Sequence, residues 1–133
     1  MKIKILIPVY NDFQSVSKLI SDINSIILND INEFSVIIVN DASTEKTEID
    51  TSNLDKLNSI KIINMKKNQG HSRCIATGLK HIFEKEEFDY VIPIDGDGED
   101  RPEEISKFVE FLKYDNTKPI VGERIKRSEG LIF

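Results

Sequence analysis

The chain has 133 residues, of which 39% are apolar, and it carries a formal net charge of −5. This length is enough for one hydrophobic core, so we expect a single domain over residues 1–133. The absence of any basic block argues against nucleic-acid binding and against a polybasic membrane patch, and it favours a small-molecule ligand.

The chain contains one cysteine, Cys74, which cannot form an internal disulfide. This fits a reducing compartment and predicts a cytoplasmic protein, with Cys74 as a small buried apolar residue. The apolar stretch at the N-terminus is cut short at Pro8, so it predicts neither a signal peptide nor a membrane span.

Short apolar runs rich in β-branched residues predict four buried strands, as in a parallel sheet covered on both faces. The polar segment at 40–59 predicts a surface loop with only a weak helical signal around Leu54 and Leu57. The four strands are expected at 3–9, 34–39, 60–65 and 88–94, and a fifth is expected to open at 120–122.

Apolar residues at three- and four-residue steps predict three helices between the strands. The first helix should leave Lys18, Asp22 and Asn24 on its outer face, and Gly78 in the second predicts a close approach to another backbone. The predicted buried stripes are Val16, Leu19, Ile20, Ile23, Ile26 and Ile27, then Ile75, Ala76, Leu79, Ile82 and Phe83, and finally Ile105, Phe108, Val109 and Leu112.

Strands that alternate with helices predict an α/β fold: a mainly parallel sheet flanked by helices, with right-handed crossovers. In such sheets, ligands bind beyond the carboxyl ends of the strands. Polar residues follow each predicted strand there, so the candidate site is built from residues 10–12, 40–43, 68–71 and 95–100.

The run Asp95-Gly96-Asp97-Gly98-Glu99-Asp100 follows the fourth strand directly. Four acids this close repel one another unless a cation lies among them, so the run predicts a Mg²⁺ or Mn²⁺ site. The two glycines allow the loop to turn so that Asp95 and Asp97 face one ion. The alternative is a turn followed by a helix cap, which we favour for Asp100, and Glu99 is open between the two roles.

Tyr10, Asp12 and Asp41 are candidates for holding a nucleobase, because a phenol ring can stack on a base and a carboxylate can accept its imino proton. Asp12 is an equally good N-cap for the first helix, and this alternative stays open. For Asp41 we favour base recognition over an Asx turn, whereas Asn40 is interpreted as a turn residue.

The second helix opens near Gly70, where free backbone N–H groups can bind phosphate and Arg73 can add a guanidinium group. A solvent-exposed Arg73 on the outer helix face is an equal alternative. Arg124, in a basic turn after the expected fifth strand, can reach a diphosphate or lie in solvent. His71 and His81 lack metal-ligand spacing, so we interpret both as surface histidines.

Four motifs, in this order, resemble the glycosyltransferase family 2 catalytic domain of GT-A fold, particularly its dolichol-phosphate mannose synthase and polyprenyl-phosphate glycosyltransferase branch. Residues 8–12 resemble the family's Pro-Val-Tyr-Asn-Glu, and residues 39–43 resemble Val-Asp-Asp-Gly-Ser. Residues 68–79 resemble Asn-x-Gly, three residues, Ala, three residues, Gly-Leu, with Cys74 at the Ala position. Residues 95–103 resemble Asp-Ala-Asp-Leu-Gln-Asp-Pro-Pro-Glu, and residues 121–124 resemble the branch's Val-x-Gly-x-Arg.

The resemblance implies a site for a nucleotide-diphosphate sugar. It places Asp41 on the base and Asp95 near the donor ribose or sugar. Asp97 becomes the principal ligand of Mg²⁺ or Mn²⁺, with Glu99 able to join the metal shell, and Asp95 and Asp97 are the catalytic carboxylates. The implied donor-binding residues are Pro8, Tyr10, Asp12, Asp41, Asn68, Arg73, Asp95, Gly96 and Arg124.

The chain departs from the family pattern in several places. Asn40 replaces the first aspartate of its pair, Ala42 a usual glycine, Gly98 a bulky apolar residue and Glu99 a glutamine. Family domains are usually longer, so we expect residues 1–133 to be the N-terminal, donor-binding part of a truncated catalytic domain. Any membrane association would then come from C-terminal residues that are not present, at the cytoplasmic face.

The implied reaction is a metal-dependent, inverting transfer of a sugar to an acceptor. No later carboxylate offers a general base, so either that base lies beyond this chain or the acceptor is a polyprenyl phosphate, whose oxyanion needs none. We favour the second. The alternative function is a truncated nucleotide-sugar-binding module without turnover.

Overall fold

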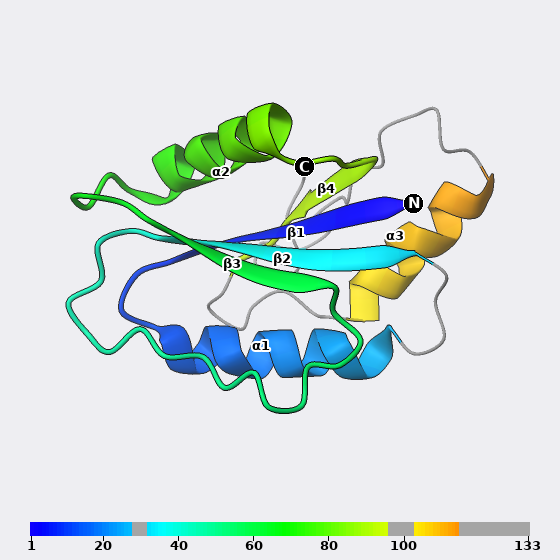
Figure 1. Cartoon of the computed structure of the whole chain (residues 1–133), viewed down its shortest axis with the longest axis horizontal. Coiled ribbons are helices and arrows are strands. Elements are labelled where there is room, and N and C mark those ends of the chain that lie inside the picture. The colour runs from blue at the N-terminus through cyan, green and yellow to red at the C-terminus, as the bar shows by residue number, and fades with distance from the viewer. Residues whose placement is uncertain (28–31, 96–102, 115–133) are drawn as a thin grey trace, which may run out of the picture.

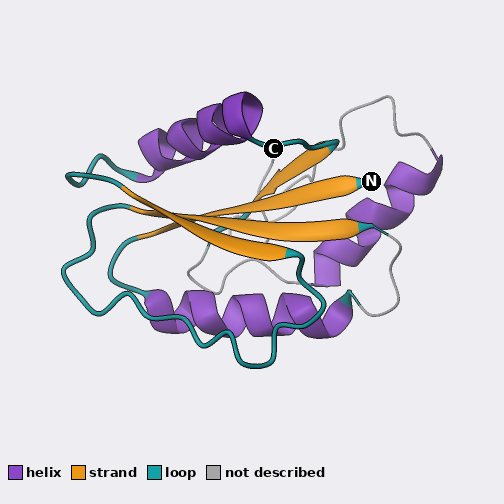
Figure 2. Ribbon diagram, in the orientation of Figure 1, coloured by secondary structure: helices purple, strands orange, loops and turns teal. Residues whose placement is uncertain are grey.

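The computed structural model describes residues 1–27, 32–95 and 103–114 (Figures 1 and 2). All four predicted strands and all three predicted helices are confirmed, and the expected fifth strand lies outside the described residues. None of the helices in the described residues has both the length and the apolar character needed to cross a membrane. The elements are β1 (Lys2–Val9), α1 (Phe13–Ile26), β2 (Glu33–Asn40), β3 (Ser59–Asn64), α2 (His71–Lys85), β4 (Tyr90–Pro93) and α3 (Glu103–Tyr114).

The described strands form one parallel sheet in the order β3-β2-β1-β4. The central strands β1 and β2 are buried over almost their whole length, because helices cover both faces of the sheet (Figure 2). Their register places Ile5 of β1 beside Val36 of β2 on one side and Ile92 of β4 on the other. The predicted mainly parallel sheet flanked by helices is therefore confirmed.

The sheet separates two hydrophobic cores, because successive side chains of a strand point to opposite faces. Helices α1 and α3 cover one face and α2 covers the other (Figure 1). The larger core joins Ile3, Ile5 and Ile7 of β1 to Val16 and Ile20 of α1 and Ile105 of α3. The smaller core joins Leu6, Ile37 and Val39 of the sheet to Cys74 and Ile82 of α2.

The buried face of α2 differs from the predicted one. Leu79 is 40% exposed and Phe83 is 78% exposed, whereas Cys74, Gly78 and Ile82 are buried. These three residues recur at steps of four and share one face. The prediction is right for Ile82, whereas Gly78 lies on the contact line in place of the larger Leu79 and Phe83. The close approach predicted at Gly78 exists, but it is to side chains: a Cβ there would overlap Leu6 Cδ1 and lie 3.1 Å from Val39 Cγ2.

We expect Gly78→Ala to destabilise the fold by about 1–2 kcal/mol despite the better helix propensity of alanine. Leu6 is fully buried, so its side chain has no solvent-filled space into which it can move. Urea denaturation measures the effect, with Lys80→Ala on the exposed face of α2 as the control. A Gly78→Ala variant as stable as that control would contradict the close contact.

Asn24 of α1 is only 8% exposed, so its predicted position on the outer face is wrong. Its Nδ2 donates to the Asn53 carbonyl at 3.0 Å, and its Oδ1 accepts from the Lys56 N–H at 2.9 Å. Residues 41–58 contain no helix, and the apolar residues Leu54 and Leu57 pack on the larger core. Asn24 therefore fastens this long loop to α1 through backbone hydrogen bonds.

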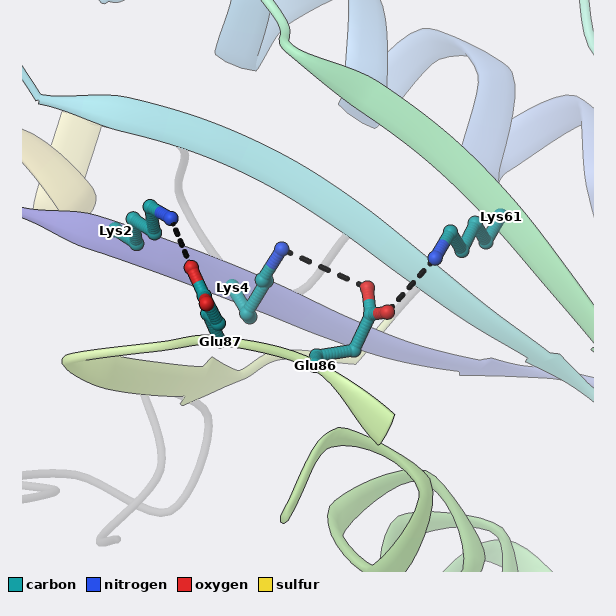
Figure 3. Close-up of polar contacts among 5 residues, drawn as sticks. All are labelled: Lys2, Lys4, Lys61, Glu86 and Glu87. Carbon is teal, nitrogen blue, oxygen red and sulfur yellow. Dashed lines mark hydrogen bonds and ion pairs between the residues drawn. The ribbon is translucent and has the colours of Figure 1, made fainter. Parts of the chain in front are cut away.

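Charged residues lie between the sheet and the end of α2 (Figure 3). Glu86, directly after α2, has a side chain only 10% exposed, and its carboxylate lies 3.6 Å from Lys4 Nζ of β1 and 2.7 Å from Lys61 Nζ of β3. The Lys4 side chain is equally buried. At the exposed rim, Lys2 and Glu87 form a separate pair at 2.5 Å. The Glu86 carboxylate thus ties α2 to two strands from inside the fold.

Candidate functional site

The carboxyl ends of the four parallel strands meet at one edge of the sheet, where α1 and α2 begin (Figure 1). Pro8 is buried near the end of β1, and Tyr10, just beyond it, is 50% exposed. Asp41 follows β2 and is only 4% exposed, while Asp95 follows β4 with a side chain 20% exposed. At this edge, therefore, the aromatic ring is half exposed, one carboxylate is buried and the other is partly exposed.

Asp41 fixes the loop that leads into α2. Its Oδ1 accepts from the Gln69 N–H at 2.7 Å and its Oδ2 from the Gly70 N–H at 2.9 Å. Asn68 Nδ2 donates to the Asp41 carbonyl at 3.3 Å. The carboxylate thus connects the end of β2 to the start of α2, and each oxygen keeps a second lone pair for another donor.

Cys74, on the first turns of α2, is fully buried, and the Asp41 carboxylate is close enough to affect its thiol. Burial, together with the neighbouring carboxylate, raises the pKa of the thiol to about 12. The thiol is therefore protonated at neutral pH. Its predicted role as a small buried residue is confirmed.

We expect Asp41→Asn to lower the free energy of unfolding by about 2–3 kcal/mol, because an amide can accept from only one of the two backbone N–H groups and turns a donor toward the other. Chemical denaturation measures the loss. Asp50→Asn is the matched control, since Asp50 is exposed and, among the described residues, its carboxylate accepts hydrogen bonds from nearby Ser52. Equal stability of the two variants would contradict the structural role of Asp41.

Asp12 is the N-cap of α1, and its Oδ1 accepts from the Ser15 N–H at 3.4 Å. The preceding residue, Asn11, has a positive φ of 51°, a conformation in which asparagine is enriched. Asn11 Oδ1 accepts from the N–H groups of Thr44 and Glu45 at 2.7 and 3.0 Å. Asn11, which the sequence did not single out, therefore joins the loop after β1 to the loop after β2.

Asn40 acts as the predicted turn residue, since its Oδ1 accepts from the Ser43 N–H at 3.1 Å. Its Nδ2 also donates to Asn64 Oδ1 of β3 at 2.9 Å. Ala42 within this turn has a φ of 58°, a left-handed conformation that glycine adopts without steric cost. This conformation explains why the related motif carries glycine at that position.

Helix α2 begins after Gly70, whose φ is 92° and which, as a glycine, has no side chain to cap the helix. Arg73 is exposed, as the solvent-facing alternative expected, and Asn68 is exposed at the same end of the helix. His71 Nε2 lies 3.3 Å from Asp95 Oδ1. Interpreting His71 as a plain surface residue missed this pair, because no local pattern relates the start of α2 to the end of β4.

Four predicted site residues, namely Gly96, Asp97, Glu99 and Arg124, lie outside the described residues, as does the proposed cap Asp100. Within the described ranges, no group of three or more His, Cys, Asp or Glu side chains is arranged to hold a metal ion. The metal site and its ligands, Asp97 and Glu99, therefore stay predictions.

The family model described as glycosyl transferase family 2 matches residues 4–132. The chain belongs to glycosyl transferase family 2. The match includes every described strand and helix except the first residues of β1, together with all the predicted site residues.

Two relatives and two solved structures add detail to the family 2 assignment. The chain is 26% identical to an uncharacterized protein of Methanocaldococcus jannaschii, over 90% of this chain and 50% of that protein. It is 28% identical to a dolichol-phosphate mannosyltransferase of Pyrococcus furiosus, over 85% of this chain and 30% of that protein. The chain thus spans half or less of the length of these relatives.

Among solved structures, S. aureus TarS 1–349 in complex with UDP-GlcNAc is similar, with a TM-score of 0.67 and 25% identity over 86% of this chain and 32% of that one. TarS 1–349 without that ligand gives a TM-score of 0.60 and 28% identity, over 86% of this chain and 33% of that one. The likeness confirms the predicted GT-A fold for this family 2 chain.

Proposed function

We propose that this chain is the nucleotide-sugar-binding part of a metal-dependent, inverting glycosyltransferase. The observation that carries the proposal is the meeting of Tyr10, Asp41, α2 and Asp95 at one sheet edge, in a chain that a family 2 model matches almost throughout. Ligands bind at this edge of open α/β sheets. The UDP-GlcNAc complex of TarS supports the donor class.

The nucleotide would lie across the ends of β1 and β2. Tyr10 is half exposed, so its ring is available to stack on a base, and Pro8 and Asp12 frame the loop that carries it. Asp41, whose oxygens already accept two backbone N–H groups, would offer a remaining lone pair to the base.

The diphosphate would lie at the start of α2, where the N-cap residue Gly70 has no side chain to occupy the first helical N–H groups. Arg73 on the first turn is exposed and can reach an anion, Asn68 borders the same loop, and Arg124 would approach from the later segment. In this proposal the helix start and the two arginines would supply the positive charge that a diphosphate needs.

Asp97 and Glu99 would hold Mg²⁺ or Mn²⁺, with Gly96 allowing the backbone to approach the donor and Asp95 bordering the ribose or sugar. Oxygen ligands suit both cations, and the run begins with Asp95, which lies at the sheet edge close to His71. When bound, the metal would neutralise charge on the departing diphosphate. The carboxylates of the chain would orient the donor for attack at the anomeric carbon.

The acceptor is proposed to be a polyprenyl phosphate at the cytoplasmic face of a membrane. Its oxyanion is already a nucleophile, so the reaction would need no general base from this chain. Similarity to a protein named as a dolichol-phosphate mannosyltransferase supports this acceptor class. The alternative is a module that binds a nucleotide sugar without turnover.

A binding titration followed by two turnover assays tests the proposal. Uridine and guanosine diphosphate sugars are titrated with Mn²⁺ present, and then donor hydrolysis and transfer to a polyprenyl phosphate are assayed. Binding with turnover supports the enzyme, and binding without either reaction supports the module. Absence of binding across the panel would contradict both.

A further inference from the structure

A histidine and a carboxylate from two different elements meet at the donor edge. His71 is the first residue of α2, and its Nε2 lies 3.3 Å from Oδ1 of Asp95, the second residue after β4. The His71 side chain is 57% exposed and that of Asp95 is 20% exposed. The contact therefore lies at the surface of the proposed donor site, where a ligand can reach the carboxylate.

The fold holds the backbone on both sides of this contact. Gly70, just before His71, donates its N–H to Asp41, and its carbonyl accepts from the Cys74 N–H at 3.1 Å. Ile94, just before Asp95, donates its N–H to the Leu6 carbonyl at 2.9 Å and so extends the pairing of β4 with β1. The distance between the two side chains is thus set by the sheet and by the start of the helix.

Asp95 opens a run that contains three further acids. Repulsion from neighbouring carboxylates favours side-chain rotamers that point away from them, into solvent. An imidazole nitrogen held 3.3 Å from one carboxylate oxygen restricts the rotamers of that carboxylate and thereby the direction of its other oxygen. Partners of this kind commonly decide how well a site residue performs.

We propose that His71 is a positioning residue that orients the Asp95 carboxylate toward the ribose or sugar of the donor. The inference rests on the proposed function, because it takes Asp95 as a donor contact. His71 itself acts through Asp95 and requires no contact with the donor. His71 begins the helix whose preceding loop is held by Asp41, the proposed base contact. Asp95, the proposed sugar contact, follows β4, so the pair links the two proposed parts of the site.

A double-mutant cycle tests this role, with the affinity for UDP-GlcNAc, or for another panel sugar that the wild type binds, measured in Mn²⁺. We expect His71→Ala to weaken binding about 10-fold, and His71→Gln, which keeps an N–H near the Nε2 position, to stay within about 3-fold of the wild type. In an Asp95→Ala background, His71→Ala should cause no further loss. Lys80→Gln on the exposed face of α2 is the control and should bind as the wild type does.

A general structural role would weaken binding by the same factor in both backgrounds, and that result would overturn the inference. Wild-type affinity in His71→Ala would overturn it as well, as would failure of His71→Gln to restore binding. A different observation would contradict the proposed function, namely a wild-type chain that binds no nucleotide sugar. That result would contradict the inference as well.

Discussion

Asp97→Asn is expected to weaken Mn²⁺-dependent binding of a nucleotide sugar by about 100-fold or more while leaving the stability of the fold unchanged. Asp97 lies two residues beyond Asp95, which follows β4 at the carboxyl edge of the sheet. The substitution keeps the shape of the side chain and removes its charge, so it separates metal binding from folding. Calorimetric titration of the sugar with and without Mn²⁺ measures the loss.

Asp100→Asn is the matched control for this variant. It removes the same charge from the same acidic run, but asparagine caps a helix as well as aspartate does, so we expect both affinity and stability to stay close to the wild type. If Asp97→Asn binds Mn²⁺ and the nucleotide sugar normally, the assignment of the metal ligand is wrong.

Glu86→Gln is expected to lower the free energy of unfolding by roughly 2–4 kcal/mol, the largest stability change that we predict. The variant would leave Lys4, whose side chain is only 10% exposed, without its countercharge beneath α2 (Figure 3). Urea denaturation at neutral pH measures the loss. Glu87→Gln is the control: this side chain is 85% exposed, and its pair with Lys2 should contribute at most about 1 kcal/mol.

A compensating substitution sharpens the Glu86 experiment. Lys4→Met removes the buried ammonium group, so the double variant Lys4→Met/Glu86→Gln should recover much of the stability lost in Glu86→Gln. If the stability lost in the double variant equals the sum of the losses in Lys4→Met and Glu86→Gln, the two side chains do not depend on each other. A Glu86→Gln variant as stable as Glu87→Gln would contradict the buried cluster.

The same carboxylate gives a pH dependence with a defined sign. The hydrogen bond from Lys61 lowers the pKa of Glu86 from its usual value, and the charges of Lys61 and Lys4 lower it further, against the opposing effect of burial. A pKa that is lower in the folded than in the unfolded state gives stability that is full above the unfolded pKa and disappears as the pH falls through the folded one. The difference in the free energy of unfolding between the wild type and Glu86→Gln should therefore become smaller on acidification below about pH 4.

The sequence predicted the strands well because the central ones are covered on both faces. The β-branched runs that became β1 and β2 carry that signal along their whole length, and their observed ends differ by only a residue or two from the predicted ones. Lys4 interrupts the apolar run of β1 without breaking it, because Glu86 neutralises its charge from α2. That partner is far along the chain, so local pattern could not reveal it.

The predicted face of α2 failed for a reason that lies in packing. Leu79 and Phe83 suggest a buried stripe by their size, but the helix lies so close to Leu6 and Val39 that the contact line takes Gly78 instead. Phe83 packs its ring against Phe88, with the two centroids 6.2 Å apart, rather than into the core. Hydrophobicity alone cannot distinguish these two faces of one helix.

The sequence predicted where the candidate site lies on the sheet, but it predicted few of the contacts between the side chains there. Topology alone brings the ends of β1, β2 and β4 together, so Tyr10, Asp41 and Asp95 were expected near one another. The hydrogen bonds of Asp41 to the loop before α2, and the pair of His71 with Asp95, depend on side-chain directions between distant segments. These contacts determine how the polar residues at the sheet edge are oriented, and the sequence alone does not show them.

The central claim is that this edge binds a nucleotide-diphosphate sugar with a divalent cation. Titration of the wild-type chain with UDP and GDP sugars, once in Mn²⁺ and once in EDTA, tests it most directly. We predict saturable binding of at least one sugar in Mn²⁺ and loss of that binding in EDTA. Absence of binding in both conditions, or equal binding in both, would contradict the account.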